Sequence, residues 1–260
     1  MPVRNEPWPP GTPCWVDLQA DDVKAASAFY GALFGWTFND LGPEAGGYVM
    51  AELNGSVAAG VGPKPEGSPM PSAWTTYLAV EDADATAAKI TAAGGAVTAP
   101  PFDVMDAGRM AVAADPTGAV FGLWQAERHN GAEAYNEPGA YVWNEVHTRD
   151  LAAAEAFYST VFGYTIAAMD PSAPDAYKVF TVPGGADVAG GLANDAAEPG
   201  EGAYWLTWFA VADTDAAVAT ASGLGGSVLM PAQDSAIGRM AVVAGAQGEA
   251  FGLIAMPSNG

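Results

Sequence analysis

Two acidic residues occupy matching places in two similar segments of the chain. Asp17 lies in the stretch CWVDLQA and Glu145 lies in the stretch VWNEVHT, and each follows a tryptophan, Trp15 or Trp143, by two positions. Because side chains two apart on a strand point to the same face, each carboxylate should share a face with an indole ring. A carboxylate in that setting can hold an ammonium group through cation–π support, or act as a general base if burial raises its pKa. Asp17 and Glu145 are therefore candidates for catalysis and for ligand binding, with a plain rim charge as the alternative.

Large aromatic side chains are predicted on the same two faces. The alternation of later strands leaves Tyr77 and Trp124 beside Trp15 in the first half, and Trp208 beside Trp143 in the second. Further candidates are methionines: Met50, Met105 and Met110 in the first half, Met230 and Met240 in the second. Aromatic rings that converge on a concave surface suit a planar ligand, whereas rings that only fill an unused cavity are the alternative.

The doubled phrase GRMAV places one arginine in each half, Arg109 and Arg239. The chain has only nine basic residues, so each arginine is a candidate anchor for an anion or a carbonyl group of a ligand. The alternative is a salt bridge that holds the preceding loop, with Asp106 or Asp234 as the partner.

The whole chain of 260 residues is a duplication. Residues 14–36 match 142–164, residues 74–97 match 205–228, and residues 108–124 match 238–254. Each half also repeats a smaller plan, in which a strand leads through an acidic N-cap into an alanine-rich helix and then into short strands. The sequence therefore predicts four βαβββ modules in two domains, at 11–127 and 139–257, with a polar linker at 128–138.

Composition excludes several classes of function. The formal net charge is −21, from 30 acidic and 9 basic residues, which disfavours nucleic acids and anionic membranes as partners. No apolar run is long enough to span a bilayer, the first residues lack an apolar signal segment, and the single cysteine fits a reducing cytoplasm. The chain also contains no Walker A loop, no dinucleotide-binding glycine motif and no GxSxG elbow.

Several phrases resemble the vicinal oxygen chelate superfamily, which includes glyoxalase I, bleomycin-resistance proteins, ring-cleaving dioxygenases and fosfomycin-resistance enzymes. They are FYGALFGW (29–36) with FYSTVFGY (157–164), AVEDAD (79–84) with AVADTD (210–215), and DPTGAVFGLW (115–124). The chain is most similar to the tandem two-domain glyoxalase-like members of actinobacteria. The resemblance implies an α+β fold in which paired modules form two curled, mostly antiparallel sheets. Each concave face makes a cup, helices cover the outside, and modules pair either within a half or across halves.

Metal-dependent members of this superfamily carry histidine or glutamate ligands on three strands of the cup. The resemblance places these positions at Trp15, Thr75 and Gly122 in the first half, and at Trp143, Leu206 and Gly252 in the second. None of these side chains is a good ligand for a divalent ion, so no metal and no other cofactor is expected. A glycine in place of a carboxylate should also leave room for a ligand. The two histidines lie elsewhere, His129 in the linker and His147 at the rim.

The leading hypothesis is a cytoplasmic protein that binds a planar aromatic small molecule without a metal. A polyketide antibiotic, another antibiotic or a precursor would be bound for sequestration, self-resistance or assistance to biosynthesis. The alternative is a metal-free lyase, isomerase or hydroxylase-type enzyme acting on a similar substrate, and a metal-using glyoxalase is a third option. A biosynthetic enzyme is a further possible partner, and both monomer and homodimer stay open.

Overall fold

The computed structural model describes residues 3–65, 67–173, 177–185, 187–194 and 202–257. The elements of the first half are β1 (Pro13–Ala20), α1 (Val23–Phe34), β2 (Thr37–Asp40), a short 3₁₀ turn (Pro43–Ala45), β3 (Val49–Leu53), β4 (Ser56–Pro63), β5 (Ala73–Ala79), α2 (Ala83–Ala92), β6 (Ala96–Val104), β7 (Gly108–Ala114) and β8 (Val120–Ala126). Those of the second half are β9 (Tyr141–Thr148), α3 (Leu151–Phe162), β10 (Thr165–Ala168), β11 (Tyr177–Thr181), β12 (Asp187–Asn194), β13 (Tyr204–Ala210), α4 (Thr214–Gly223), β14 (Ser227–Ser235), β15 (Gly238–Ala244) and β16 (Ala250–Ala255). The predicted order of two βαβββ modules in each half is confirmed.

Two eight-stranded sheets repeat one topology. The strand order is β2-β3-β4-β1-β5-β8-β7-β6 in the first sheet and β10-β11-β12-β9-β13-β16-β15-β14 in the second. Most neighbours are antiparallel, and the parallel pairs are β1–β4, β5–β8, β9–β12 and β13–β16. The two modules of each half therefore pair with each other through β1–β5 or β9–β13, and not with modules of the other half.

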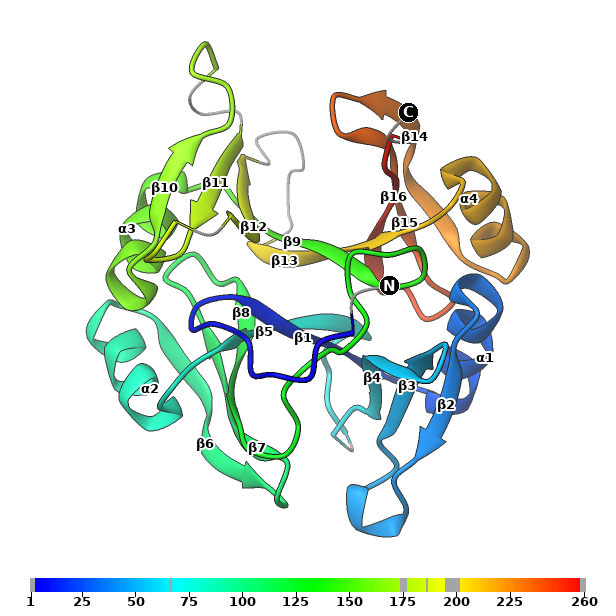
Figure 1. The fold of residues 1–260 in the computed structure, drawn as a ribbon, viewed down its shortest axis with the longest axis horizontal. Helices are drawn as coiled ribbons and strands as arrows, with labels where there is room; N and C mark the ends of the chain where they lie inside the picture. Colours follow the sequence, from blue (N-terminus) through cyan, green and yellow to red (C-terminus); the bar gives the residue numbers. More distant parts are fainter. Residues whose placement is uncertain (1–2, 66, 174–176, 186, 195–201, 258–260) are drawn as a thin grey trace.

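Both sheets are curved, and their concave faces open in opposite directions (Figure 1). The helices lie at the two sides between the sheets, where α1 contacts α4 and α2 contacts α3. The predicted α+β fold with helices on the outer face of each sheet is confirmed, and the outer faces of the two sheets meet in the middle of the molecule. Among the described residues, no helix has the length and apolar character that a bilayer crossing requires.

The helices begin where the sequence predicts. The side chain of Asp22 accepts a hydrogen bond from the backbone N–H of Ala25, three residues on. The side chains of Asp82, Asp150 and Asp213 likewise accept from the backbone N–H three residues on. Gly35 ends α1 in the left-handed conformation, at φ 76°, which a residue with a side chain rarely adopts. The FG pair of the repeated phrase is thus a helix stop.

The tyrosine of that phrase joins the two halves. Tyr30 on α1 is fully buried, and its hydroxyl donates to Oε1 of Glu249, between β15 and β16 of the other half, at 2.8 Å. The indole N–H of Trp74 in turn donates to the Tyr30 hydroxyl at 3.0 Å. Glu249 is only 1 % exposed, so the hydroxyl satisfies a carboxylate that water cannot reach.

The second half returns the same contact. The hydroxyl of Tyr158 on α3 donates to Oδ2 of Asp115, between β7 and β8, at 3.0 Å, and Trp205 donates to Tyr158 at 2.9 Å. Burial is the main cause that raises the pKa of both tyrosines, and the neighbouring carboxylate adds to it. Each copy of the phrase thus supplies one of two reciprocal contacts between the halves.

A smaller polar group lies where the sheets meet. The hydroxyls of Thr76 and Thr207 each donate to Oδ1 of Asn144 at 2.9 Å. Asn144 is fully buried. Because Thr76 comes from the first half and Thr207 from the second, this carbonyl fixes the register between the two outer faces.

We expect Tyr30→Phe to lower the free energy of unfolding by about 1–3 kcal/mol, because the buried carboxylate of Glu249 loses its hydroxyl donor. Urea unfolding of Tyr30→Phe, Glu249→Gln and the double variant would form a double-mutant cycle, which isolates the pair from other effects of each change. A coupling energy indistinguishable from zero would contradict the role given to this contact.

Candidate functional site

The sheet register brings the predicted aromatic residues together in two cups. The first cup is the concave face around Trp15, Asp17, Tyr77 and Trp124, and Trp15 pairs with Tyr77, which pairs with Gly122. The second cup is the concave face around Trp143, Glu145, Leu206, Trp208 and Ile254, where Trp143 pairs with Trp208 and Trp208 with Gly252. Each cup thus has an aromatic row that crosses its centre.

The two glycines in these rows lie under aromatic rings. A Cβ atom added to Gly122 would lie 2.0 Å from Cδ1 of Tyr77, and one added to Gly252 would lie 2.1 Å from Cε3 of Trp208. The expectation that glycine leaves room for a ligand is therefore wrong. The space above each glycine is taken by the ring from the neighbouring strand.

The polar atoms of the first cup converge on Asp17. Tyr48 and Tyr77 donate hydrogen bonds to Oδ2 of Asp17 at 3.2 and 3.1 Å, and the indole N–H of Trp15 donates to Tyr48 at 3.1 Å. Burial raises the pKa of Asp17 to about 7, although the tyrosine donors oppose this shift. Its other oxygen, Oδ1, has no hydrogen-bond partner among the described residues.

The linker covers the first cup. The imidazole of His129 lies 4.5 Å from the ring of Trp15 and 5.5 Å from that of Trp124, edge-on to both. Trp124 also donates its indole N–H to the backbone carbonyl of His129 at 2.8 Å. Burial lowers the pKa of His129 to about 4, so the ring is neutral at pH 7. With Trp15 at 3 % and Trp124 at 6 % exposure, the first cup is filled by the protein's own chain.

The second cup has the same tryptophan–tyrosine–carboxylate chain of hydrogen bonds, but its carboxylate bonds to a histidine where that of the first cup bonds to a second tyrosine. The indole N–H of Trp143 donates to the hydroxyl of Tyr177 at 2.6 Å, and Tyr177 donates to Oε2 of Glu145 at 2.7 Å. His147 Nε2 lies 2.8 Å from Oε1 of the same carboxylate. Burial, followed by the charge of Glu145, raises the pKa of Tyr177. Both oxygens of Glu145 are therefore engaged, one by a phenol hydroxyl and the other by an imidazole nitrogen.

An apolar surface surrounds this chain of hydrogen bonds. Leu206, Trp208 and Ile254 are buried and form its floor. The partly buried residues packed against them include Trp143, Tyr204, Met230 and Met240. The ring of Tyr204 stacks on His147 at 4.8 Å, with an angle of 3° between the planes. The indole nitrogen of Trp208 has no acceptor within the described part of the chain.

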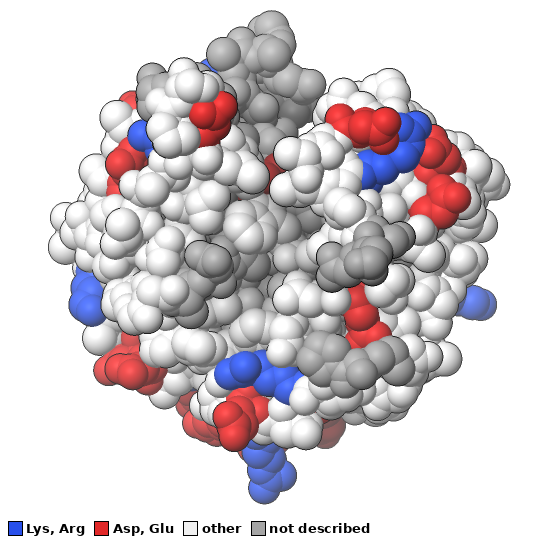
Figure 2. All heavy atoms as spheres, turned by 45° about the horizontal axis from the view of Figure 1, so that its top comes forward, with Lys and Arg blue, Asp and Glu red and all other residues white. Residues whose placement is uncertain are grey.

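Charge is sparse in the hollow on this side of the molecule. Figure 2 turns the second sheet toward the viewer, and the described atoms of the hollow between the β10–β12 side and the β14–β16 side are mainly uncharged, while acidic and basic side chains gather around its edge. Such a surface suits an apolar ligand with few polar groups.

The residues of the cups do not fit a divalent metal ion. The three expected ligand positions carry indole, threonine hydroxyl or leucine, and glycine, and the glycines are covered by rings. Glu145 and His147 supply two donors, but no group of three histidine, cysteine, aspartate or glutamate residues able to hold a metal occurs within the described ranges. We derive no chemistry through a metal ion.

Arg109 and Arg239 lie outside both cups. Arg109 donates to Asp84, at the start of α2, at 2.7 and 3.0 Å, and to Asp103 on β6 at 2.6 Å. Arg239 makes the matching bonds to Asp215 and Asp234. These bonds lower the pKa of Asp84 and Asp215. The arginines therefore join each helix start to a neighbouring hairpin.

The predicted partner Asp234 of Arg239 is confirmed, whereas the predicted partner Asp106 of Arg109 is wrong. Asp106 pairs instead with Arg128 at 2.8 Å. Met105 lies in the tight turn between β6 and β7, at φ 49° and 58 % exposed. Met50 is half-buried on β3 and packs against the core of the first half.

Sequence reasoning missed three residues of the cups. Tyr48 and Tyr177 donate hydrogen bonds to the two carboxylates. They lie 129 positions apart, a separation between the offsets of 128 and 130 that relate two of the matched segment pairs. That spacing was the available signal. His129 was predicted only as part of the linker, and nothing local to its sequence indicates that its ring enters a cup.

Comparison with known proteins gives a consistent family. Residues 14–123 match the model of the glyoxalase/bleomycin resistance protein/dioxygenase superfamily, and residues 141–172 match that of the bleomycin resistance protein-like N-terminal family. The chain is 45 % identical over 259 residues to the protein named "Putative glyoxylase CFP32" of Mycobacterium tuberculosis (strain CDC 1551 / Oshkosh), covering 98 % of both chains. It is 37 % identical to the anthracycline biosynthesis protein DnrV of Streptomyces peucetius, covering 94 % of this chain and 93 % of DnrV.

Solved structures show the same fold at low identity. The Mn(II)-bound glyoxalase from Novosphingobium aromaticivorans superimposes with a TM-score of 0.65 at 14 % identity, over 95 % of this chain and 82 % of that one. The 2,3-dioxygenase LapB from Pseudomonas sp. KL28 superimposes with a TM-score of 0.63 at 13 % identity, over 96 % and 95 % of the two chains.

We expect Asp17→Asn to raise the free energy of unfolding at pH 8 by on the order of 2–4 kcal/mol and to reduce the pH dependence of stability. The folded pKa of about 7 lies above the unfolded value, so the folded state binds more protons and wild-type stability falls as pH rises from about 4 to 7. His129 acts in the opposite sense below pH 6.5, because its folded pKa is lowered. Urea unfolding of variant and wild type at each pH cancels the His129 contribution.

Glu44→Gln is the control variant, because it removes one carboxylate from an exposed position in the 3₁₀ turn. A stability difference between Asp17→Asn and wild type that stays constant from pH 5 to pH 8 would show that Asp17 is not a buried acid.

Proposed function

Because this chain belongs to the glyoxalase/bleomycin resistance protein/dioxygenase superfamily, we propose that its second cup binds a planar aromatic small molecule without the help of a metal ion. The observation that carries the proposal is the partly exposed Trp143, which stands beside an apolar floor with its N–H already held by Tyr177. Its ring face is the part of the residue left for a ligand. Planar aromatic ligands gain most from such offset or edge contacts with fixed rings.

The first cup supports this assignment by contrast. It carries the same tryptophan, tyrosine and carboxylate, but His129 lies against Trp15 and Trp124. A ligand would have to displace a segment of the protein there. We therefore assign one ligand to each chain, in the second cup.

Charge suggests the kind of ligand. Glu145 places a carboxylate at the second cup, and the chain carries a formal charge of −21. An aromatic compound with an amino group gains from both, whereas an anion is repelled. The relative DnrV is named for anthracycline biosynthesis, and anthracyclines combine a planar aromatic body with an amino sugar. Sequestration, self-resistance and assistance to a biosynthetic enzyme are the roles that such binding would serve.

We expect an anthracycline such as daunorubicin to quench the tryptophan fluorescence of the protein in the presence of EDTA. Trp143→Leu should weaken binding by about tenfold or more, because the stacking ring is lost. Trp15→Leu is the matched control, since it changes the equivalent ring in the covered first cup. Absence of quenching, or a loss of binding confined to Trp15→Leu, would contradict the assignment.

One observation favours a second candidate, a metal-free lyase or isomerase. Glu145 lies at hydrogen-bond distance from His147 and Tyr177, so a candidate base, an imidazole that can relay its proton and a phenol that orients it lie together at the second cup. Asp17 is the weaker candidate for a base, because the first cup is covered.

If this second candidate holds, EDTA-treated protein should convert the adduct of methylglyoxal and glutathione, with a bell-shaped pH–rate profile. Glu145→Gln should abolish turnover while daunorubicin still binds, more weakly because its amino group loses the carboxylate, and Asp17→Asn should leave turnover intact. Protein that binds daunorubicin yet shows no turnover of this probe would favour the binding role.

A further inference from the structure

The two halves meet at two equivalent contacts, here called seams, in each of which the turn before the last strand of one half faces the turn before the first helix of the other. In the filled seam, the side-chain amide of Gln247 lies against the turn that precedes α1. Asp22 donates its backbone N–H to Oε1 of Gln247 at 2.9 Å, and Nε2 of Gln247 donates to the backbone carbonyl of Asp22 at 2.9 Å. The hydroxyl of Ser72 lies 3.4 Å from the same Oε1. One carboxamide thus satisfies a donor and an acceptor of a strand-to-helix turn.

The open seam is the equivalent place before α3. There the matched positions carry Thr117 in place of Gln247, Ala203 in place of Ser72, and Asp150 in place of Asp22. Each of the first two changes shortens a side chain or removes its hydroxyl. The result is a pocket of about 310 Å³.

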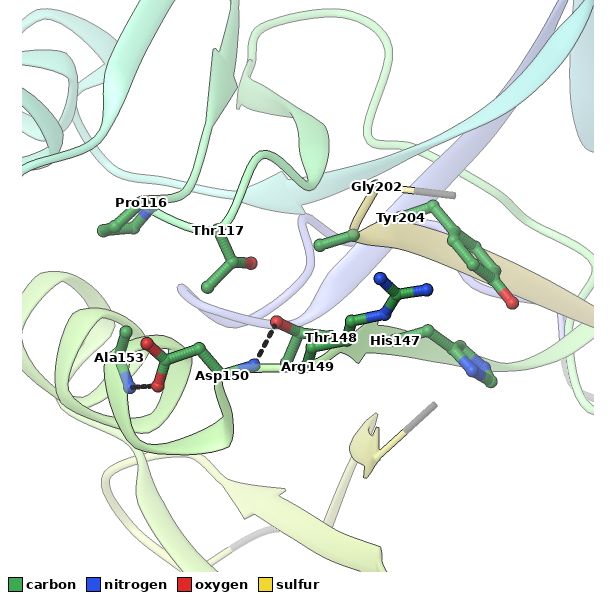
Figure 3. A pocket seen from close by; sticks show the side chains of 10 residues that line it. Pro116, Thr117, His147, Thr148, Arg149, Asp150, Ala153, Gly202 and Tyr204 are labelled. Atoms are coloured by element: carbon green, nitrogen blue, oxygen red, sulfur yellow. Dashed lines mark hydrogen bonds between the residues drawn. The ribbon is translucent and has the colours of Figure 1, made fainter. Parts of the chain in front are cut away.

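The lining of the open seam combines apolar walls with mixed polar groups (Figure 3). Ala153 and Pro116 lie at one end, and Tyr204 with His147 at the other. Arg149 and Asp150 bring one charge of each sign. This balance favours a neutral dipolar group over an anion, because a carboxylate would face the carboxylate of Asp150.

The backbone N–H of Asp150 has a different acceptor from that of Asp22, which donates to Gln247. The N–H of Asp150 already donates to the hydroxyl oxygen of Thr148 at 3.2 Å, and the Asp150 side chain caps Ala153 at 3.0 Å. The backbone carbonyl of Asp150 accepts from Ala154, as that of Asp22 accepts from Ala26, and in the filled seam such a carbonyl also accepts from the amide of Gln247. A carbonyl oxygen has two lone pairs, so the one at Asp150 can take a second donor.

From these two seams we infer that the open seam binds a small neutral ligand that carries a primary carboxamide. The ligand's N–H₂ donates to the carbonyl of Asp150, as Gln247 donates to Asp22, and its carbonyl accepts from the hydroxyl of Thr148. A flat apolar body fits the wall formed by Tyr204. This site is separate from the ligand proposed for the second cup, although His147 and Tyr204 border both.

Benzamide is the probe, followed by amide shifts in ¹H–¹⁵N NMR spectra of the full chain. We expect saturating shifts at Thr117, Thr148, Asp150 and Ala153. Thr117→Gln reproduces the side chain of the filled seam and should weaken benzamide binding by about tenfold or more. Thr117→Ser is the matched control, because it keeps the hydroxyl and leaves the pocket open, and it should bind as wild type does.

Several outcomes would overturn the inference. They are the absence of saturating shifts in wild type, unchanged binding by Thr117→Gln, and tighter binding of benzoate than of benzamide. Should Thr117→Gln fail to fold, Ala153→Leu fills the same pocket from α3 and must weaken binding. Trp143→Leu should leave benzamide binding unchanged, so a failure of the second-cup proposal is distinguishable from a failure here.

Discussion

A tyrosine hydroxyl of each half donates to a carboxylate buried in the other half, and this exchange fixes how the two sheets stand. Tyr30 reaches Glu249, and Tyr158 reaches Asp115. Each carboxylate also accepts hydrogen bonds from its own turn, through its other oxygen. The tyrosine supplies the donor for the remaining oxygen, and a buried carboxylate oxygen left without that donor would cost more than an ordinary hydrogen bond contributes. The outer faces of the two sheets therefore meet, and the two concave faces turn away from each other (Figure 1).

The contacts between the halves are the same in both directions, but the residues that complete the two concave faces differ. Both cups keep a tryptophan, a tyrosine and a carboxylate in one hydrogen-bonded chain. The first cup ends at Tyr77 and receives His129 from the linker, whereas the second ends at His147. Burial of Asp17 shifts its pKa to about 7, which is the electrostatic cost of closing a surface around an acid. The two seams diverge in the same manner, with Gln247 in one and Thr117 in the other.

Local patterns in the sequence predicted much of the fold. The N-caps, the glycine helix stops and the two-residue alternation depend on neighbours in the chain, and the duplication allowed each prediction to be checked against a second copy. The alternation also predicts that Trp15 shares a face with Asp17, and Trp143 with Glu145, and in each pair one tyrosine hydroxyl bonds to both side chains.

Local sequence patterns do not predict contacts between segments that are far apart in the chain. The entry of His129 into the first cup depends on the path of the linker, and the pairing of Arg109 with Asp84 depends on how α2 packs on β7. The ring of Tyr77 over Gly122 is a contact between two strands whose register the sequence does not state. Each of these features is set by packing, which periodicity alone does not describe.

The rings that lie over Gly122 and Gly252 limit which side chains these two positions can carry. A glutamate introduced at position 252 would collide with the indole of Trp208 before it could offer an oxygen to any cation. Trimming the indole first would leave a void in the floor of the sheet, with its own penalty in stability. Either change made alone is unfavourable, so a carboxylate at position 252 requires a simultaneous change at position 208 on the adjacent strand. Steric exclusion by the Trp208 ring thus maintains glycine at position 252.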